Sequence, residues 1–210
     1  MEAKSLDGRS VRAKSIYNVA HKKLVNSAIE LFNDPDVPNE NINISLIAKN
    51  AGTSVATAYN HFPNNLIDVF GSIFNIGFQK IVDSVTEFNK NNPDPYDQLQ
   101  AFIKIQTDTA VELGNAVREA FYEFRELLIS GKWIQGEPYL FLMSICDEYA
   151  KQNSDIDATS LADDIFVLWN GYIYLWMRYN PNFEIWSKFT DEWLVQQMSK
   201  IVDKAIFLQK

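Results

Sequence analysis

Side chains that could recognise a nucleic-acid duplex gather between residues 45 and 61. Asn60 could hydrogen-bond the edges of bases in the major groove, and Val55 could contact a thymine methyl group. The hydroxyl and imidazole groups nearby could donate to phosphates, as could the free amides at a helix N-terminus. The predicted DNA contacts are Ser45, Lys49, Thr53, Ser54, Val55, Ala56, Thr57, Tyr59, Asn60 and His61.

Two short helices joined by a glycine turn are expected to position these side chains. Asn43 and Ser54 are the predicted N-caps, because their side-chain oxygens can accept from the free amides of a first turn. Gly52 can take the positive φ that ends the first helix. The second helix should span 55–61, with Ala58 and Phe62 facing inward. Its other residues are small or polar, which is typical of a helix that faces a partner.

The distribution of charge agrees with contact to DNA at one part of the chain. The net charge is −8, but no Asp or Glu occurs from residue 41 to residue 67. Residues 1–67 hold 7 Lys/Arg against 6 Asp/Glu, whereas residues 68–210 hold 12 against 21. Few cations can displace counterions, so we expect modest, salt-sensitive binding.

A family resemblance appears in the same residues. The run Ile47-Ala48-Lys49-Asn50-Ala51-Gly52-Thr53-Ser54, followed by Tyr59-Asn60-His61-Phe62, resembles the DNA-binding motif of the tetracycline-repressor (TetR) family of bacterial regulators. The motif-level match covers about residues 15–70. Three positions depart from the family pattern: Thr53 and Ala58 are smaller or more polar than usual, and Asn65 stands where relatives carry a phosphate-binding lysine.

The periodicity of apolar residues predicts an all-α protein of about nine helices with a helix-turn-helix. Residues 1–65 should form a three-helix DNA-binding domain, and residues 66–210 a larger ligand-binding and dimerisation domain. Residues 1–12 are expected to be a flexible basic arm. The helices are expected near 14–32, 43–51, 55–61, 66–88, 96–113, 115–129, 137–152, 158–179 and 184–208.

The last two expected helices predict a homodimer. Apolar residues occupy nearly all sides of the helix at 158–179, and a helix of this kind must be covered all round. With 184–208 it could form a four-helix bundle across a two-fold axis, as the resemblance also implies. Two DNA-binding domains about 34–36 Å apart would then read a palindromic operator. The alternative is a monomer whose core uses both helices.

An aromatic-rich stretch predicts a site for a small-molecule effector. A cavity between helices lined by aromatic side chains suits an apolar or cationic-aromatic compound, and Glu119, Glu123 and Asp164 could pair with a positive charge. The alternative is that these aromatics fill the core and the acids are solvated. The predicted ligand contacts are Phe102, Phe121, Tyr122, Trp133, Phe141, Trp169, Tyr172 and Trp176.

Other function classes find little support in the sequence. The two histidines, His21 and His61, form no zinc motif, and neither a phosphate-binding glycine loop nor a Gly-x-Ser-x-Gly motif occurs. We therefore expect no enzyme activity, no metal and no cofactor. With a single cysteine, no N-terminal signal peptide and no apolar stretch beyond 13 residues, a cytoplasmic protein is expected, without a membrane partner.

The sequence thus predicts a transcriptional repressor that binds a palindromic operator as a homodimer and is released by a small-molecule effector. The alternative is a helical protein–protein adaptor of the same fold that has little affinity for DNA. The absence of a lysine at Asn65 motivates this alternative.

Overall fold

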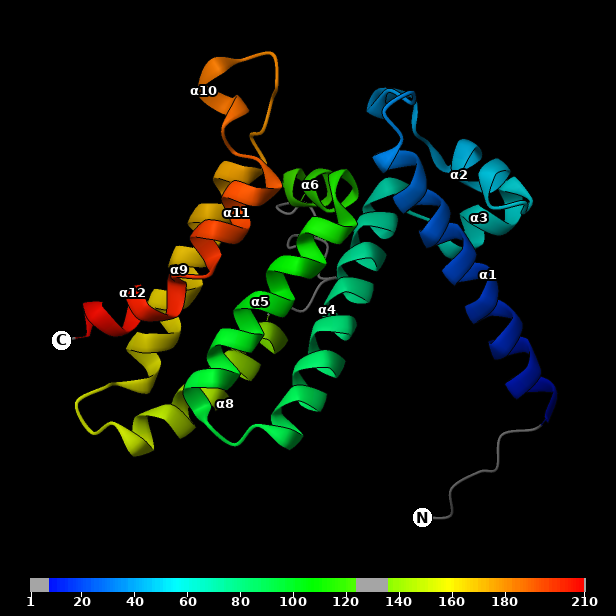
Figure 1. The fold of residues 1–210 in the computed structure, drawn as a ribbon. Helices are drawn as coiled ribbons and strands as arrows, with labels where there is room; N and C mark the ends of the chain where they lie inside the picture. Colours follow the sequence, from blue (N-terminus) through cyan, green and yellow to red (C-terminus); the bar gives the residue numbers. More distant parts are fainter. Residues whose placement is uncertain (1–7, 124–135, 210) are drawn as a thin grey trace. The chain divides into compact units, whose positions relative to one another are not determined.

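The computed structural model describes residues 8–123 and 136–209, and the regular secondary structure in these ranges is helical (Figure 1). They contain eleven α-helices and one short 3-10 helix, η1 (Asn39–Asn41), and no β-strand. The prediction of an all-α fold is confirmed. The expected helix at 115–129 is described only as far as α6 (Asn115–Tyr122). None of the described helices combines the length and hydropathy needed to cross a bilayer.

The described chain separates into two compact units. Residues 8–74 and 115–123 belong to the first unit, and residues 75–114 and 136–209 belong to the second. The boundary falls inside the long helix α4 (Leu66–Asn91), and α6 joins the first unit although it follows α5 (Pro95–Leu113) in the chain. The expected boundary at residue 65 divides a DNA-binding domain from a ligand-binding and dimerisation domain. The division into packed units does not test that difference in function, so the boundary stays a prediction.

The first unit packs α1 (Gly8–Asn33) against α2 (Ile44–Asn50), α3 (Val55–His61) and α6. The hydroxyl of Ser27 on α1 donates to the carbonyl oxygen of Ile47 on α2 at 2.9 Å, inside a core of apolar side chains. Helix α1 begins at Gly8, so the expected flexible arm over 1–12 is wrong for residues 8–12. Ile16 and Val19 on this helix are 63% and 56% exposed, because helix packing covers only the C-terminal part of α1.

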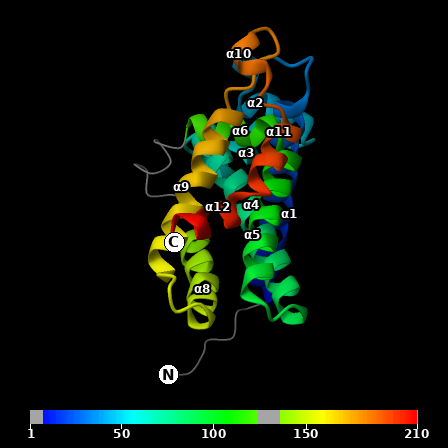
Figure 2. The same ribbon diagram turned by 60° about the vertical axis from the view of Figure 1, so that its left-hand side comes forward.

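The second unit is a bundle in which α9 (Ala158–Trp176) packs on α8 (Gly136–Gln152) and on the last helices of the chain (Figure 2). The single helix expected over 184–208 is wrong: the structure has α10 (Glu184–Ser187), α11 (Asp191–Met198) and α12 (Ile201–Leu208). Thr190 begins α11 as an N-cap, and its hydroxyl accepts from the Trp193 amide at 3.2 Å.

Helix α9 has two different faces. Its buried face ends at Trp176, which is 0% exposed and whose indole nitrogen donates to the Asp191 carboxylate at 2.8 Å, joining α9 to α11. Its other face exposes Phe166, Val167 and Tyr174. The sequence predicted that a helix with apolar residues on nearly all sides must be covered all round. The second unit covers only one face of α9.

Candidate nucleic-acid interface

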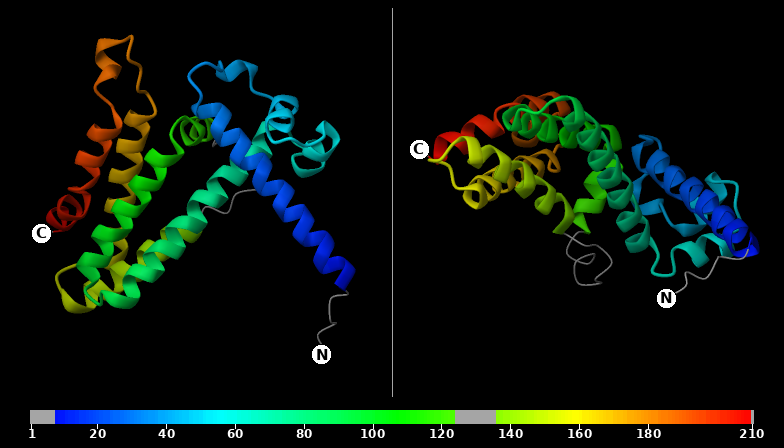
Figure 3. Two further views of the ribbon diagram at one scale, coloured as in Figure 1. Left: turned by 45° about the vertical axis from the view of Figure 1, so that its right-hand side comes forward. Right: turned by 90° about the horizontal axis from the view of Figure 1, so that it is seen from below.

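Helices α2 and α3 form the predicted helix-turn-helix, and Figure 3 shows them beside α1. The side chain of Asn43 accepts from the Leu46 amide at 3.0 Å, and the hydroxyl of Ser54 accepts from the Thr57 amide at 3.0 Å. Gly52 has a φ of 65° between the helices. Both predicted caps and the predicted turn glycine are confirmed. These local interactions fix the start of both helices and the end of α2.

Most of the predicted DNA contacts are accessible. Val55 is 42% and Tyr59 45% exposed, which leaves both side chains available to a partner. Thr53 and Thr57 are half-buried; the Thr53 hydroxyl donates to the Ala48 carbonyl oxygen at 3.4 Å. The remaining exposed members of the predicted set are Ser45, Lys49, Ser54, Ala56 and Asn60.

His61 differs from its prediction because it faces inward. It is 8% exposed, and its ring lies 4.0 Å from the ring of Tyr17 and 5.4 Å from that of His21, measured between centroids. Both partners lie on α1, which covers the C-terminal end of α3. The prediction that His61 faces outward to bind a phosphate is therefore wrong for this structure. The spacing of Tyr17, His21 and Leu24 at helical intervals is the sequence signal that could have shown this packing.

Burial lowers the pKa of both histidines, and the nearby His21 lowers the pKa of His61 further. The Nδ1 atoms of both rings are buried and have no hydrogen-bond partner within the described ranges. Protonation would therefore place positive charge on neighbouring rings without an acceptor for the added proton. The neutral forms suit this part of the first unit.

We expect the stability of the protein to fall as the pH decreases below about 6.5. Both histidines have a lower pKa in the folded protein, so the unfolded chain binds more protons between 6.5 and the folded-state values. The contribution of the two neutral histidines to stability is complete above pH 6.5. It is lost as the pH falls from there through their folded-state pKa values. The thermal midpoint should therefore decrease between about pH 7.5 and pH 5.5.

The control for this measurement is the variant with His21→Gln and His61→Gln, which cannot titrate at these positions. Differential scanning calorimetry of both proteins over the same pH range isolates the histidine contribution, because carboxyl groups elsewhere are common to both. A variant with the same pH dependence as the natural protein contradicts the assignment to this pair.

Backbone geometry explains the absence of a lysine after α3. Asn65 has a φ of 58°, a left-handed conformation that asparagine tolerates better than lysine does. Its amide donates to the Phe62 carbonyl oxygen at 3.0 Å, and the Asn64 amide donates to the Asp68 carboxylate at 2.7 Å. This turn leads directly into α4. With no lysine at position 65, Lys49 is the single Lys or Arg between residues 24 and 79 of the sequence.

The predicted ligand contacts are divided between the two units. Phe121 and Tyr122 belong to the first unit, where Tyr122 is 58% exposed. Phe102, Trp169 and Trp176 are buried in the second unit, and Phe141 and Tyr172 there are half-buried. Trp133 lies outside the described residues. The use of these residues by an effector stays a prediction.

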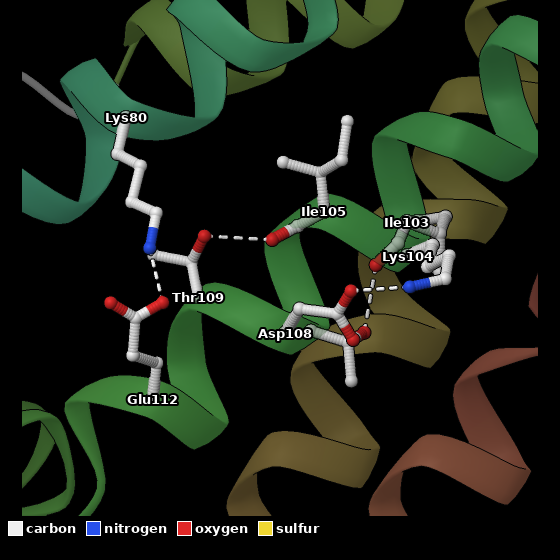
Figure 4. Close-up of polar contacts among 8 residues, drawn as sticks. Lys80, Ile103, Lys104, Ile105, Asp108, Thr109 and Glu112 are labelled. Carbon is white, nitrogen blue, oxygen red and sulfur yellow. Dashed lines mark hydrogen bonds and ion pairs between the residues drawn. The ribbon is translucent and has the colours of Figure 1, made fainter.

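A groove of about 430 Å³ occurs in the second unit, and sequence reasoning missed it. None of the eight predicted ligand contacts lines it. Helix α5 supplies one wall, where the Lys104 ammonium pairs with the Asp108 carboxylate at 2.5 Å (Figure 4). On the same helix the Thr107 hydroxyl donates to the Ile103 carbonyl oxygen at 2.7 Å. The lining residues are Phe88, Asp97, Gln100, Ala101, Ile103, Lys104, Thr107, Asp108, Val195, Met198 and Ser199.

This arrangement of helices is similar to that of a known structure. No family model matches the chain, and no curated protein matches it. A crystal structure from Syntrophomonas wolfei, described as a TetR-family transcriptional regulator, matches with a TM-score of 0.60 and 13% sequence identity, over 91% of this chain and 95% of that chain. The chain has the fold of a TetR-family regulator.

The TetR-like fold agrees with the resemblance found in residues 47–62. Among the described residues, no group of three or more His, Cys, Asp or Glu side chains could hold a metal ion.

Proposed function

We propose that this protein is a DNA-binding transcriptional regulator that reads a palindromic operator as a homodimer. The observation that carries the proposal is the exposed face of α3, a short helix fixed by a side-chain cap and presenting Val55, Tyr59 and Asn60 to solvent. A helix that contributes so little of its surface to the core is available for the major groove.

The side chains of α3 divide naturally between bases and phosphates. Val55 and Ala56 are small, so the start of the helix can approach the floor of the groove closely. Asn60, near the end of the same helix, carries both a donor and an acceptor for a base edge. Ser54 and Tyr59 supply hydroxyl donors at the two sides of the helix for the phosphate backbone.

The exposed face of α9 supports the homodimer. Phe166, Asn170 and Tyr174 recur at intervals of four residues, with Val167 and Gly171 beside them, and all five are exposed. A Cβ atom added at Gly171 would meet nothing within 4 Å in this chain, so a second helix could approach closely there. We propose that this face pairs with its copy in a second subunit.

The proposed input is a small-molecule effector bound in the second unit. The groove beside α5 is a candidate site, as are the predicted aromatic contacts that belong to this unit, Phe102, Phe141, Trp169, Tyr172 and Trp176. Repression relieved by the effector is the proposed mode of action, because binding that favours one conformation shifts the population away from the DNA-competent one.

A second candidate function is a protein–protein adaptor of the same fold. It is favoured by the scarcity of cations near α3, where His61 is buried and Asn65 replaces a lysine. Selection of bound sequences from random duplexes at low salt separates the two functions. An enriched palindrome supports the regulator, whereas its absence contradicts it and favours the adaptor.

We expect substitutions on α3 to affect the selected duplex in two different ways. Asn60→Ala should cost about 1–3 kcal/mol on the preferred sequence and relax the preference at one position, because a base contact is lost. Tyr59→Ala should weaken binding to all sequences alike. Fluorescence anisotropy with the selected duplex and with single-base variants of it measures both effects.

Asn91→Ala is the matched control, since Asn91 is an exposed asparagine at the end of α4 in the second unit. It should leave binding unchanged. The assigned orientation of α3 is wrong if Asn60→Ala behaves as this control does.

A further inference from the structure

The N-terminal part of α1 is exposed, basic and adjacent to α3. All residues from 11 to 19 are exposed. Residues 8–29 contain five Lys or Arg and no Asp or Glu. The same helix contacts α3 further along, so this segment extends from the proposed recognition helix within a single compact unit.

One face of α1 is defined by its contacts with α3. Lys14, Tyr17, His21 and Leu24 follow one another at intervals of three and four residues and therefore lie on the same side of the helix. The Tyr17 ring contacts His61, and the His21 ring lies 5.2 Å from that of Phe62. Lys14 lies one turn beyond Tyr17 on this side, is exposed, and forms no ion pair with a residue in the described ranges.

The end of α3 lacks a fixed positive charge of its own. Helix α3 contains no Lys or Arg, and the turn that follows it carries Asn64 and Asn65. His61 is buried with a lowered pKa, so it is largely neutral at pH 7. A duplex that lies against α3 would therefore meet a cation near this end only from a neighbouring element.

We propose that Lys14 binds a DNA phosphate beside the C-terminal end of α3, supplying from α1 the cation that is absent at Asn65. The inference rests on the proposed function as a DNA-binding regulator. The lysine ammonium is a point charge on a flexible stem, so it can reach a phosphate without the fixed geometry that arginine needs. Such a contact adds affinity and salt dependence and carries no sequence information.

Arg12 offers a matched control on the same exposed turn. Two residues apart on a helix, Arg12 and Lys14 point roughly 160° away from each other. Arg12 shares its side of α1 with the exposed Ile16 and Val19, away from the contacts with His61 and Phe62. Replacing either cation with glutamine changes the net charge equally, but only Lys14 lies on the side that meets α3.

The test uses the full-length protein and the duplex selected from random sequences, in a salt series from about 50 to 200 mM. Lys14→Gln should weaken binding about fivefold at the lowest salt and reduce the slope of log K against log salt by about 0.9 for each bound subunit. Lys14→Arg should restore the slope. Arg12→Gln should change it by less than half as much, and all variants should keep the natural thermal midpoint.

Equal effects of Lys14→Gln and Arg12→Gln would show that binding depends only on the total charge of the helix, and this would overturn the proposed contact. An unchanged slope in Lys14→Gln, with the natural protein binding the duplex, overturns the contact and leaves the proposed function standing. A natural protein that binds no duplex at the lowest salt overturns both.

Discussion

Phe62→Ala should destabilise the first unit by about 3–5 kcal/mol, the largest effect on stability that we expect from a substitution in the DNA-binding region. Phe62 is 0% exposed and follows α3 directly, with its ring against His21 of α1. Truncation removes buried apolar area and leaves a cavity between α3 and α1. Urea denaturation followed by circular dichroism measures the change, and DNA binding should be lost with it.

Tyr59→Ala is the control, because Tyr59 lies three residues earlier on α3 and is 45% exposed. It should alter stability by less than about 1 kcal/mol while still weakening DNA binding. The two substitutions thus separate the residues that hold α3 from the residues that it presents. A Phe62→Ala protein as stable as Tyr59→Ala would show that the core of the first unit is assigned wrongly.

The ends of α2 and α3 were predictable because their causes are local. Asn43 and Ser54 bond to amides three residues away, and Gly52 meets a backbone requirement of its own turn. The inward position of His61 depends on α1, about forty residues earlier in the chain, and periodicity within α3 cannot reveal it. Tertiary packing decided this residue.

The break of the last expected helix had a sequence signal that the apolar pattern concealed. Thr190 is a good N-cap, and Asp191 and Glu192 follow it as acids of a first turn. Apolar residues continue on both sides of it, from Trp186 to Trp193, so the periodicity suggested one helix. The groove was unpredictable for a related reason, since it brings together residues near 88, 100 and 198 whose proximity only the packed bundle creates.

Val167→Glu should convert the proposed homodimer to monomers and reduce affinity for a palindromic duplex by more than about 100-fold. Val167 is 68% exposed on the face of α9 that is proposed to pair with its copy. In a two-fold interface the same surface is used by both subunits, so one substitution buries two carboxylates without partners. Sedimentation at micromolar protein concentration measures the mass, and anisotropy with whole and half operators measures the loss of paired binding.

Leu140→Glu is the matched control, because Leu140 is 64% exposed on α8 and lies outside the proposed interface. It adds the same charge to the same unit and should remain dimeric with natural DNA affinity. Both variants should keep the natural circular dichroism spectrum, since neither side chain contributes to the core of its own chain. If Val167→Glu stays dimeric, the subunits pair through another surface. A monomeric natural protein would remove two-site reading of a palindrome and leave the apolar face of α9 to a different partner.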